Sequence, residues 1–260
     1  MLPFHALRGA DGRYLVEAHG VTYVPSLTVL RLIYDSPSAP PSDGWSAFVA
    51  GVAAQGDAHP EFFEHDDEVL AAAAARVSVC RGPRQVTPDR VLAGIAEHDL
   101  VHLTCHGFYD ETDPLRSGLM LGDGTASPPR TVRSIPPRAR HRFLATAEDV
   151  LATRTTANIV TLRACSTGLV GERNAGDEFD GLTRSFLQAG ARSVLAGQWN
   201  VDQRSSRRLV QSFYRAWLGT GAAKWQALRA AQLELLTDPT DPALAHPYHW
   251  AALSLLGDWR

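Results

Sequence analysis

The sequence predicts an α/β fold with a mostly parallel central sheet flanked by helices. Strand-like apolar runs alternate with helix-like segments along the 260 residues, and this alternation is typical of parallel strands joined by helical crossovers. Apolar residues make up 45% of the chain, which is enough for a large buried core. No repeat of solenoid length is visible, so we expect one domain over residues 1–260.

The first half of the chain alternates short strands and helices. The expected strands are residues 13–18, 21–24, 47–53, 78–81, 100–107 and 117–122, and the expected helices are residues 67–77 and 88–98. Residues 127–140 carry four prolines among basic side chains, and this composition predicts an irregular surface loop.

The second half carries clearer signals. We expect strands at residues 158–165, 193–199 and 248–257, a helix at 177–190 that ends at Gly190, and two long helices between the last two strands. In the first long helix one stripe holds Leu209, Val210, Phe213, Trp217 and Leu218, and Gly219 ends it. We interpret this stripe as core packing.

Charge and cysteine content argue against several classes of function. A net charge of -3 and a pI near 6.4 do not favour nucleic acid as a ligand. The three cysteines have no CxxC spacing and are odd in number, which favours neither a metal site nor disulfides and points to a reducing compartment. No leader or membrane-spanning run and no phosphate loop is visible, so we expect a cytoplasmic protein without a cofactor.

Two expected strands end in residues with the chemistry of a nucleophilic site. His106 closes the apolar run at residues 100–107, and Cys165 closes the run at 158–165. Ligands of open parallel sheets bind outside the carboxyl ends of the strands. Because side chains alternate faces along a strand, Cys105 points away from His106, and the two ends face each other if the strands are neighbours.

A thiol beside an imidazole can act as a nucleophile in acyl transfer, because the ring takes its proton or stabilises the thiolate. The backbone N–H groups of Gly107 and Cys165 could then stabilise the oxyanion, since glycine lets the backbone approach closely. Taken singly, Cys165 could equally be a small core residue and His106 a satisfied structural one. The histidine precedes the cysteine by 59 residues, the order seen in caspases.

Several stretches together resemble the CHAT peptidase family, relatives of caspases and separases. The matching stretches are "VHLTCHG", "SGLMLGDG", "IVTLRACSTG", "GDEFDGLTRSFLQAGARSVLAGQWNVDQRSS" and "HPYHWAALSLLGDW". The resemblance implies a caspase-like three-layer α/β/α sandwich, with His106 as general base and Cys165 as nucleophile. It also matches "LPFHAL" and "VPSLTVL", and implies that this chain starts inside the usual family N-terminus. If an edge strand is missing, the sheet exposes unpaired backbone N–H and C=O groups, and a strand of another chain could pair with them.

The resemblance also suggests a pocket for a basic substrate residue. In separases an acidic residue in a "WxVTD"-like segment reads such a residue, and "WNVDQ" places Asp202 at a similar point. Asp202 is equally an ordinary N-cap of the following helix, and Asp177 has the same two interpretations. Arg163, two residues before Cys165, could favour the thiolate or pair with an acid near residues 177–180.

Three functions remain open from the sequence. The first is a cysteine endopeptidase, a regulated bacterial effector that cleaves a protein or peptide substrate and responds to an activating partner. The second is a catalytically silent caspase-like scaffold or protein-binding module, because a fold does not fix a function. The third is another acyl transfer on the same two residues, such as amidase or transpeptidase chemistry. We expect neither nucleic acid nor a membrane as a direct partner.

Overall fold

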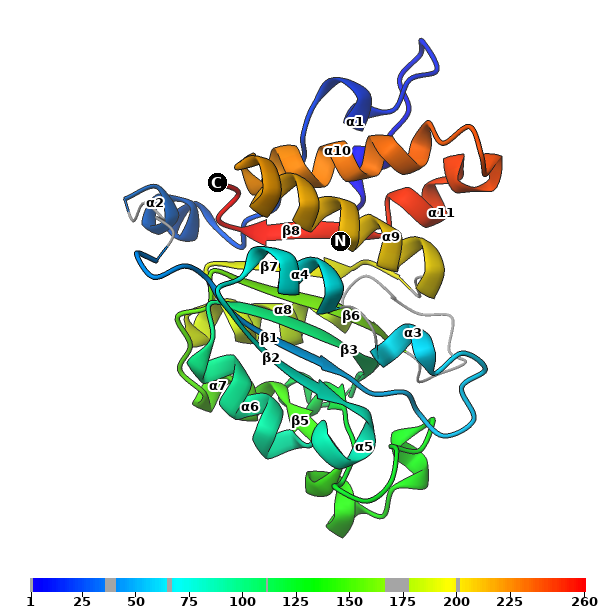
Figure 1. Ribbon diagram of the computed structural model, residues 1–260. Coiled ribbons are helices and arrows are strands. Elements are labelled where there is room, and N and C mark those ends of the chain that lie inside the picture. Colours follow the sequence, from blue (N-terminus) through cyan, green and yellow to red (C-terminus); the bar gives the residue numbers. More distant parts are fainter. Residues whose placement is uncertain (1, 36–40, 65–66, 111, 167–177, 200–201) are drawn as a thin grey trace.

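A mixed sheet runs through the centre of the protein (Figure 1). The computed structural model describes residues 2–35, 41–64, 67–110, 112–166, 178–199 and 202–260. In this part of the chain six strands lie in the order β2-β1-β3-β6-β7-β8, and β4 and β5 continue from β3 as a branch. The strands are β1 (Ser46–Gly51), β2 (Arg76–Arg81), β3 (Leu100–Phe108), β4 (Gly118–Met120), β5 (Leu144–Thr146), β6 (Ile159–Ser166), β7 (Ser193–Gly197) and β8 (Leu253–Gly257).

The predicted parallel sheet is confirmed. The pairs β1 with β2, β1 with β3, β3 with β6 and β6 with β7 are parallel. The antiparallel pairs lie at β8, which flanks β7, and in the β4 and β5 branch. The carboxyl ends of β1, β3, β6 and β7 therefore meet at one edge of the sheet, where a parallel sheet presents its ligand sites.

Helices cover both faces of the sheet (Figure 1). One face carries α5 (Gly82–Gln85), α6 (Pro88–Glu97), α7 (Ala147–Ala152) and α8 (Glu178–Ala189). The other carries α1 (Leu15–Ala18), α3 (Glu61–Glu64), α4 (Asp67–Ala73), α9 (Gln203–Tyr214), α10 (Lys224–Leu236) and α11 (Pro247–Trp250), while α2 (Leu27–Asp35) lies to one side. Short 3-10 turns span Phe4–Ala6, Pro114–Arg116, Val132–Ser134, Pro137–Arg142 and Pro242–Ala245, and a π turn spans Arg215–Gly219.

The alternation of side chains along the strands divides the core into two clusters. On β3 the residues Val101, Leu103 and Cys105 belong to the cluster under α6 and α8. Leu100 belongs to the cluster under α9 and α10, which also holds the predicted stripe of Leu209, Val210, Phe213 and Trp217. His106 has the same parity along β3 as Leu100, so its side chain is on the α9 face of the sheet, opposite Cys105 as the sequence predicts.

Three sequence predictions need correction. Residues 13–18 were expected as a strand, but α1 occupies residues 15–18, because the Glu17 carboxylate accepts the N–H of Tyr14 at 2.6 Å and Val16 is buried. Residues 21–24 contribute only one bridge, from Tyr23 to Leu256. Residues 248–257 were expected as one strand, but His246 caps a helical turn that starts at Pro247, and β8 begins only at Leu253.

The predicted end of α8 at Gly190 is confirmed. Gly190 has φ of 118°, a backbone conformation that favours glycine, and an added Cβ would lie 2.3 Å from the carbonyl oxygen of Thr155. The close approach lets the chain turn directly from α8 into β7. No helix among the described residues is long and apolar enough to cross a bilayer.

Lys224, the only lysine in the sequence, is fully buried at the start of α10. Its Nζ donates to Ser193 Oγ at 2.7 Å and to Asn158 Oδ1 at 3.0 Å, and lies 5.6 Å from the centre of the Trp217 ring. Burial lowers the pKa of Lys224 from 10.5 to about 7, and the nearby Asp258 carboxylate opposes that change. The folded protein therefore loses this proton at a much lower pH than the unfolded chain.

We expect the free energy of unfolding to rise with pH above neutrality because of Lys224. Between the folded pKa near 7 and the unfolded value of 10.5 the unfolded chain binds more protons, so raising the pH favours the folded state, by about 2 kcal/mol from pH 7 to pH 9. Denaturant unfolding at both pH values measures this change. Lys224→Met should lack this part of the pH dependence, and an identical dependence in the variant would contradict the assignment.

Candidate active site

β3 and β6 bring the two predicted catalytic residues to the same position of the sheet. The strands are parallel neighbours, and the backbone of His106 is the register partner of the backbone of Cys165. Neighbouring strands lie about 4.8 Å apart, so the two Cα atoms are close. The side chain of Cys165 lies outside the part of the chain that the structure describes.

His106 is bonded to a carboxylate that sequence reasoning missed. Its Nε2 lies 2.7 Å from Oδ2 of Asp57, and both side chains are only 8% exposed. A carboxylate at this distance accepts the Nε2 proton, which leaves Nδ1 as the basic nitrogen of the neutral ring. Asp57 therefore fixes the orientation and the tautomer of His106.

The Asp57 carboxylate is itself held from several sides. Oδ2 also accepts the backbone N–H of Ala54 at 2.8 Å, and Oδ1 lies 3.6 Å from a guanidinium nitrogen of Arg130. The ring of Phe63 on α3 lies 5.1 Å from the His106 ring. The loop after β1 thus positions the imidazole by a hydrogen bond and by ring packing.

A signal for Asp57 exists in the sequence, although it is not a motif. Asp57 follows the carboxyl end of β1, the strand next to β3, and so belongs to the edge that carries His106. An acidic residue just beyond a strand that neighbours a histidine strand is a candidate orienting group. Recognising it requires the strand order, which no local pattern reveals.

Arg163 ties the nucleophile strand to the loops around it. Its side chain is fully buried, and one terminal nitrogen donates to the Gln203 carbonyl oxygen at 2.8 Å. The other donates to the carbonyl oxygen of Phe62 at 3.4 Å. The acids at residues 177–180, which sequence reasoning offered as partners, are outside the described side chains. Arg163 thus connects β6 to α3 and to the start of α9.

Below His106 the same sheet face carries a buried polar network. Tyr214 of α9 bonds Thr161 of β6 at 2.6 Å and lies 3.4 Å from Nδ1 of His102 of β3. The other ring nitrogen of His102 lies 3.1 Å from Thr104 Oγ1. This network fixes α9 on the two strands that carry the candidate pair, and buried polar networks with full partners rigidify a core.

Gly107 lies inside β3, with Leu119 of β4 on one side and Ser166 of β6 on the other. Its backbone is extended and borders both His106 and the strand of Cys165. An oxyanion role for the N–H groups of Gly107 and Cys165 stays a prediction.

Asp202 acts as a helix cap in this structure. Its Oδ1 accepts the N–H of Ser205 at 2.8 Å at the start of α9, and lies 4.0 Å from Nδ1 of His249. A substrate role for Asp202 stays a prediction, and so does that of Asp177, which lies outside the described residues.

Asp202 also lines a cavity of about 740 Å³ beside α9. The wall includes Phe62, whose neighbour Phe63 packs on His106, and carries both signs of charge, including Glu68, Arg204 and Arg208. The cavity adjoins the edge of the sheet that carries the site. Its mixed charge gives no simple preference for a basic substrate residue.

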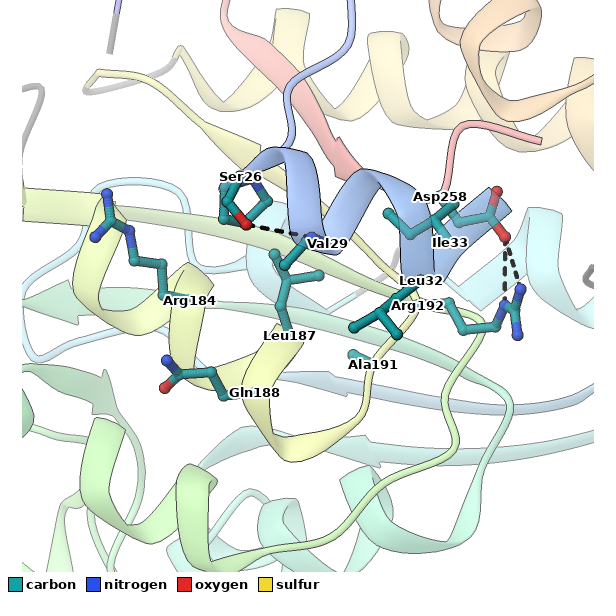
Figure 2. Close-up of a pocket in the computed structure, with 11 residues that line it drawn as sticks. Ser26, Val29, Leu32, Ile33, Arg184, Leu187, Gln188, Ala191, Arg192 and Asp258 are labelled. Carbon is teal, nitrogen blue, oxygen red and sulfur yellow. Dashed lines mark hydrogen bonds and ion pairs between the residues drawn. The ribbon is translucent and has the colours of Figure 1, made fainter. Parts of the chain in front are cut away.

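A second cavity, of about 540 Å³, lies between α2 and α8 (Figure 2). Its lining is mainly apolar, with Val29 and Ile33 from α2 facing Leu187 of α8. The Arg192 to Asp258 ion pair, at 2.9 Å, closes one side at the amino end of β7. This is the opposite edge of the parallel sheet from His106, so the cavity does not belong to the candidate site.

Cys80 and Cys105 are buried and form no disulfide among the described residues, and Cys105 belongs to the cluster on the face opposite His106. Among the described residues no cluster of three or more His, Cys, Asp or Glu side chains could hold a metal ion. The chemistry available from the described residues is that of a histidine with an orienting carboxylate.

The fold is that of caspase-like cysteine peptidases. Two solved structures share this fold. Separase in the Saccharomyces cerevisiae separase-securin complex has a TM-score of 0.53 and 12% identity, and the match covers 92% of this chain and 14% of the separase chain. The Arg-specific cysteine proteinase gingipain R has a TM-score of 0.52 and 11% identity, and the match covers 88% of this chain and 50% of the gingipain chain. The chain belongs to the CHAT domain family, whose model matches residues 1–258. The expected family and fold are confirmed.

Two curated relatives are named for another feature, the tetratricopeptide repeat. Tetratricopeptide repeat protein 28 from Homo sapiens is 25% identical over 99% of this chain, and its Mus musculus counterpart is 27% identical over 66%. The chain spans about a tenth of the length of these relatives, 11% and 8%.

Proposed function

We propose that the protein is a cysteine endopeptidase in which Cys165 is the nucleophile, His106 the general base and Asp57 the orienting carboxylate. The observation that carries this proposal is the register of His106 opposite Cys165, combined with the 2.7 Å bond from His106 to Asp57. A core histidine needs no buried carboxylate at a strand end. A catalytic histidine alternates between its neutral and its charged form, and a neighbouring carboxylate stabilises the charged imidazolium.

The proposed reaction has two acyl-transfer steps. Nδ1 of His106 takes the thiol proton as the sulfur of Cys165 attacks the peptide carbonyl carbon, and the N–H groups of Gly107 and Cys165 stabilise the resulting oxyanion. As the C–N bond breaks, the imidazolium returns the proton to the leaving amine. Water, deprotonated by the same ring, then hydrolyses the thioester and restores the thiol.

A basic residue before the cleaved bond is the proposed substrate preference, with Asp202 and Asp177 as its recognition groups. The resemblance of "WNVDQ" to the separase segment supports the choice of Asp202, and the structural neighbour gingipain R is named as Arg-specific. The Asp202 carboxylate keeps 43% of its surface exposed while it caps α9. One carboxylate oxygen therefore remains able to accept from a guanidinium.

Control by a protein partner is part of the proposal. Separase, one of the structural neighbours, forms a complex with securin, and the curated relatives are named as tetratricopeptide repeat proteins. A bacterial effector role and a cytoplasmic location follow from the sequence interpretation alone and belong to the proposal.

Digestion of a proteome-derived peptide library tests the proposal. We expect new peptide ends to appear with the wild-type protein, identified by mass spectrometry, and to be absent with Cys165→Ala. Cys105→Ala is the matched control, since Cys105 lies on the opposite face of the sheet. Cleavage that persists in Cys165→Ala would overturn the assignment, and no cleavage by any form would favour a scaffold.

A further inference from the structure

One surface of the protein carries a strong local positive charge although the whole chain is negative. Residues 124–147 contain five arginines and no acidic residue, in a chain of net charge -3. We call residues 130–142 the basic segment. It holds Arg130, Arg133, Arg138, Arg140, His141 and Arg142.

The basic segment has a regular, packed structure and differs from the irregular loop that the prolines predict. Two 3-10 turns, Val132–Ser134 and Pro137–Arg142, form most of it. Its apolar side packs Val132 and Ile135 against Met120 and Leu144 in a separate small core. The arginines are therefore presented on a fixed backbone, which reduces the entropy lost when a ligand binds.

The segment lies next to the candidate site. Met120, which supports it, is the register partner of His106 on β4. The adjoining residues Ser127 and Pro128 accept hydrogen bonds from Gln55, at 2.9 Å each, in the loop that carries Asp57. Arg130 itself lies 3.6 Å from the Asp57 carboxylate. A chain bound along this surface would pass close to the strand ends.

Two exposed arginines of the segment have no anionic partner among the described residues. Arg142 pairs with Asp123 at 2.8 Å, and Arg130 contacts Asp57. Arg133 and Arg138 are exposed, and neither forms an ion pair within the described part of the chain. Their charges are available to a ligand, and guanidinium groups bind carboxylates by paired hydrogen bonds.

We propose that the basic segment binds an acidic stretch of polypeptide and forms a docking surface for protein substrates beside the catalytic pair. The role of this surface in substrate docking rests on the proposed endopeptidase function. The class of substrate is a protein with an acidic stretch. Arrays of exposed arginine fit carboxylates and also phosphates. An acidic peptide fits better here than nucleic acid, because single-stranded nucleic acid binds by stacking on exposed aromatic rings, and the aromatic neighbours Phe108 and Phe143 are partly buried against the small core.

Binding of a fluorescein-labelled peptide of alternating glutamate and glycine to Cys165→Ala protein tests the surface without any turnover. We expect fluorescence anisotropy to show binding at 50 mM NaCl that weakens at least tenfold at 300 mM NaCl. The double variant Arg133→Glu/Arg138→Glu should weaken binding at least tenfold. Arg154→Glu, an exposed arginine without an ion pair among the described residues, should change it less than twofold.

Three outcomes would overturn the proposal. The first is no binding of the acidic peptide. The second is equal binding by the double variant and the wild-type surface. The third is tighter binding of a uridine decanucleotide than of the peptide, lost in the double variant, which would make the segment a nucleic-acid surface. Because the thiol is absent throughout, none of these results depends on peptidase activity, and library cleavage tests that activity separately.

Discussion

Replacement of His106 by alanine is expected to lower kcat/KM for a peptide found in the library by about a thousandfold. A positioned general base contributes roughly 10² to 10⁴ in rate, and His106 is the register partner of Cys165 in the sheet. The same change should slow alkylation of Cys165 by iodoacetamide at pH 7, measured by mass spectrometry, because less thiolate forms without the imidazole.

The control for this variant is His19→Ala, which removes an exposed histidine after α1. It should leave both the cleavage rate and the alkylation rate within twofold of the wild-type values. If His106→Ala kept the wild-type alkylation rate at Cys165, the two residues would not form a catalytic pair and the proposed mechanism would be wrong.

Asp57→Asn is expected to lower kcat by about a hundredfold with little change in KM. Asparagine keeps the shape of the side chain but loses the charge that stabilises the imidazolium. A loss confined to kcat indicates an interaction made mainly in the transition state. Steady-state kinetics on the library-derived peptide separate the two constants.

A structural effect of Asp57→Asn must be distinguished from a catalytic one. Asp57 also accepts the N–H of Ala54, and an amide oxygen can keep that bond. We therefore expect the midpoint of thermal unfolding to fall by only a few degrees. Asp113→Asn, a helix-cap variant at a short 3-10 turn, is the matched control and should keep full activity. Full kcat in Asp57→Asn would remove Asp57 from the mechanism.

The sequence predicts the two strands of the site because both are long apolar runs. Residues 100–107 and 158–164 are buried on both faces of the sheet, as central parallel strands are, so period and composition suffice to find these strands. The family block around Cys165 adds the specific chemistry. Which strands are neighbours follows from the complete topology, and only the structure provides it.

Other parts of the site and fold depend on contacts that no local pattern reveals. Asp57 lies in a loop 49 residues before its partner His106, and only the strand order joins them. Arg163 donates hydrogen bonds to the backbone carbonyl oxygens of Phe62 and Gln203. Every residue has such an oxygen, so the sequence does not reveal these partners. The strand predicted at residues 13–18 failed because local capping and packing against Trp250 override the β propensity of Tyr14 and Val16.

The most direct test is labelling of the purified protein with electrophilic peptides that end in Arg, Lys, Leu or Asp. Mass spectrometry locates the modified cysteine in the wild-type, His106→Ala and Cys165→Ala proteins. The proposed mechanism predicts that Cys165 alone is modified and that the modification requires His106. If the Asp202 carboxylate binds a basic substrate residue, the peptides that end in Arg and Lys react preferentially. Modification of Cys80 and Cys105 to the same extent as Cys165, or modification of Cys165 that is independent of His106, would contradict it.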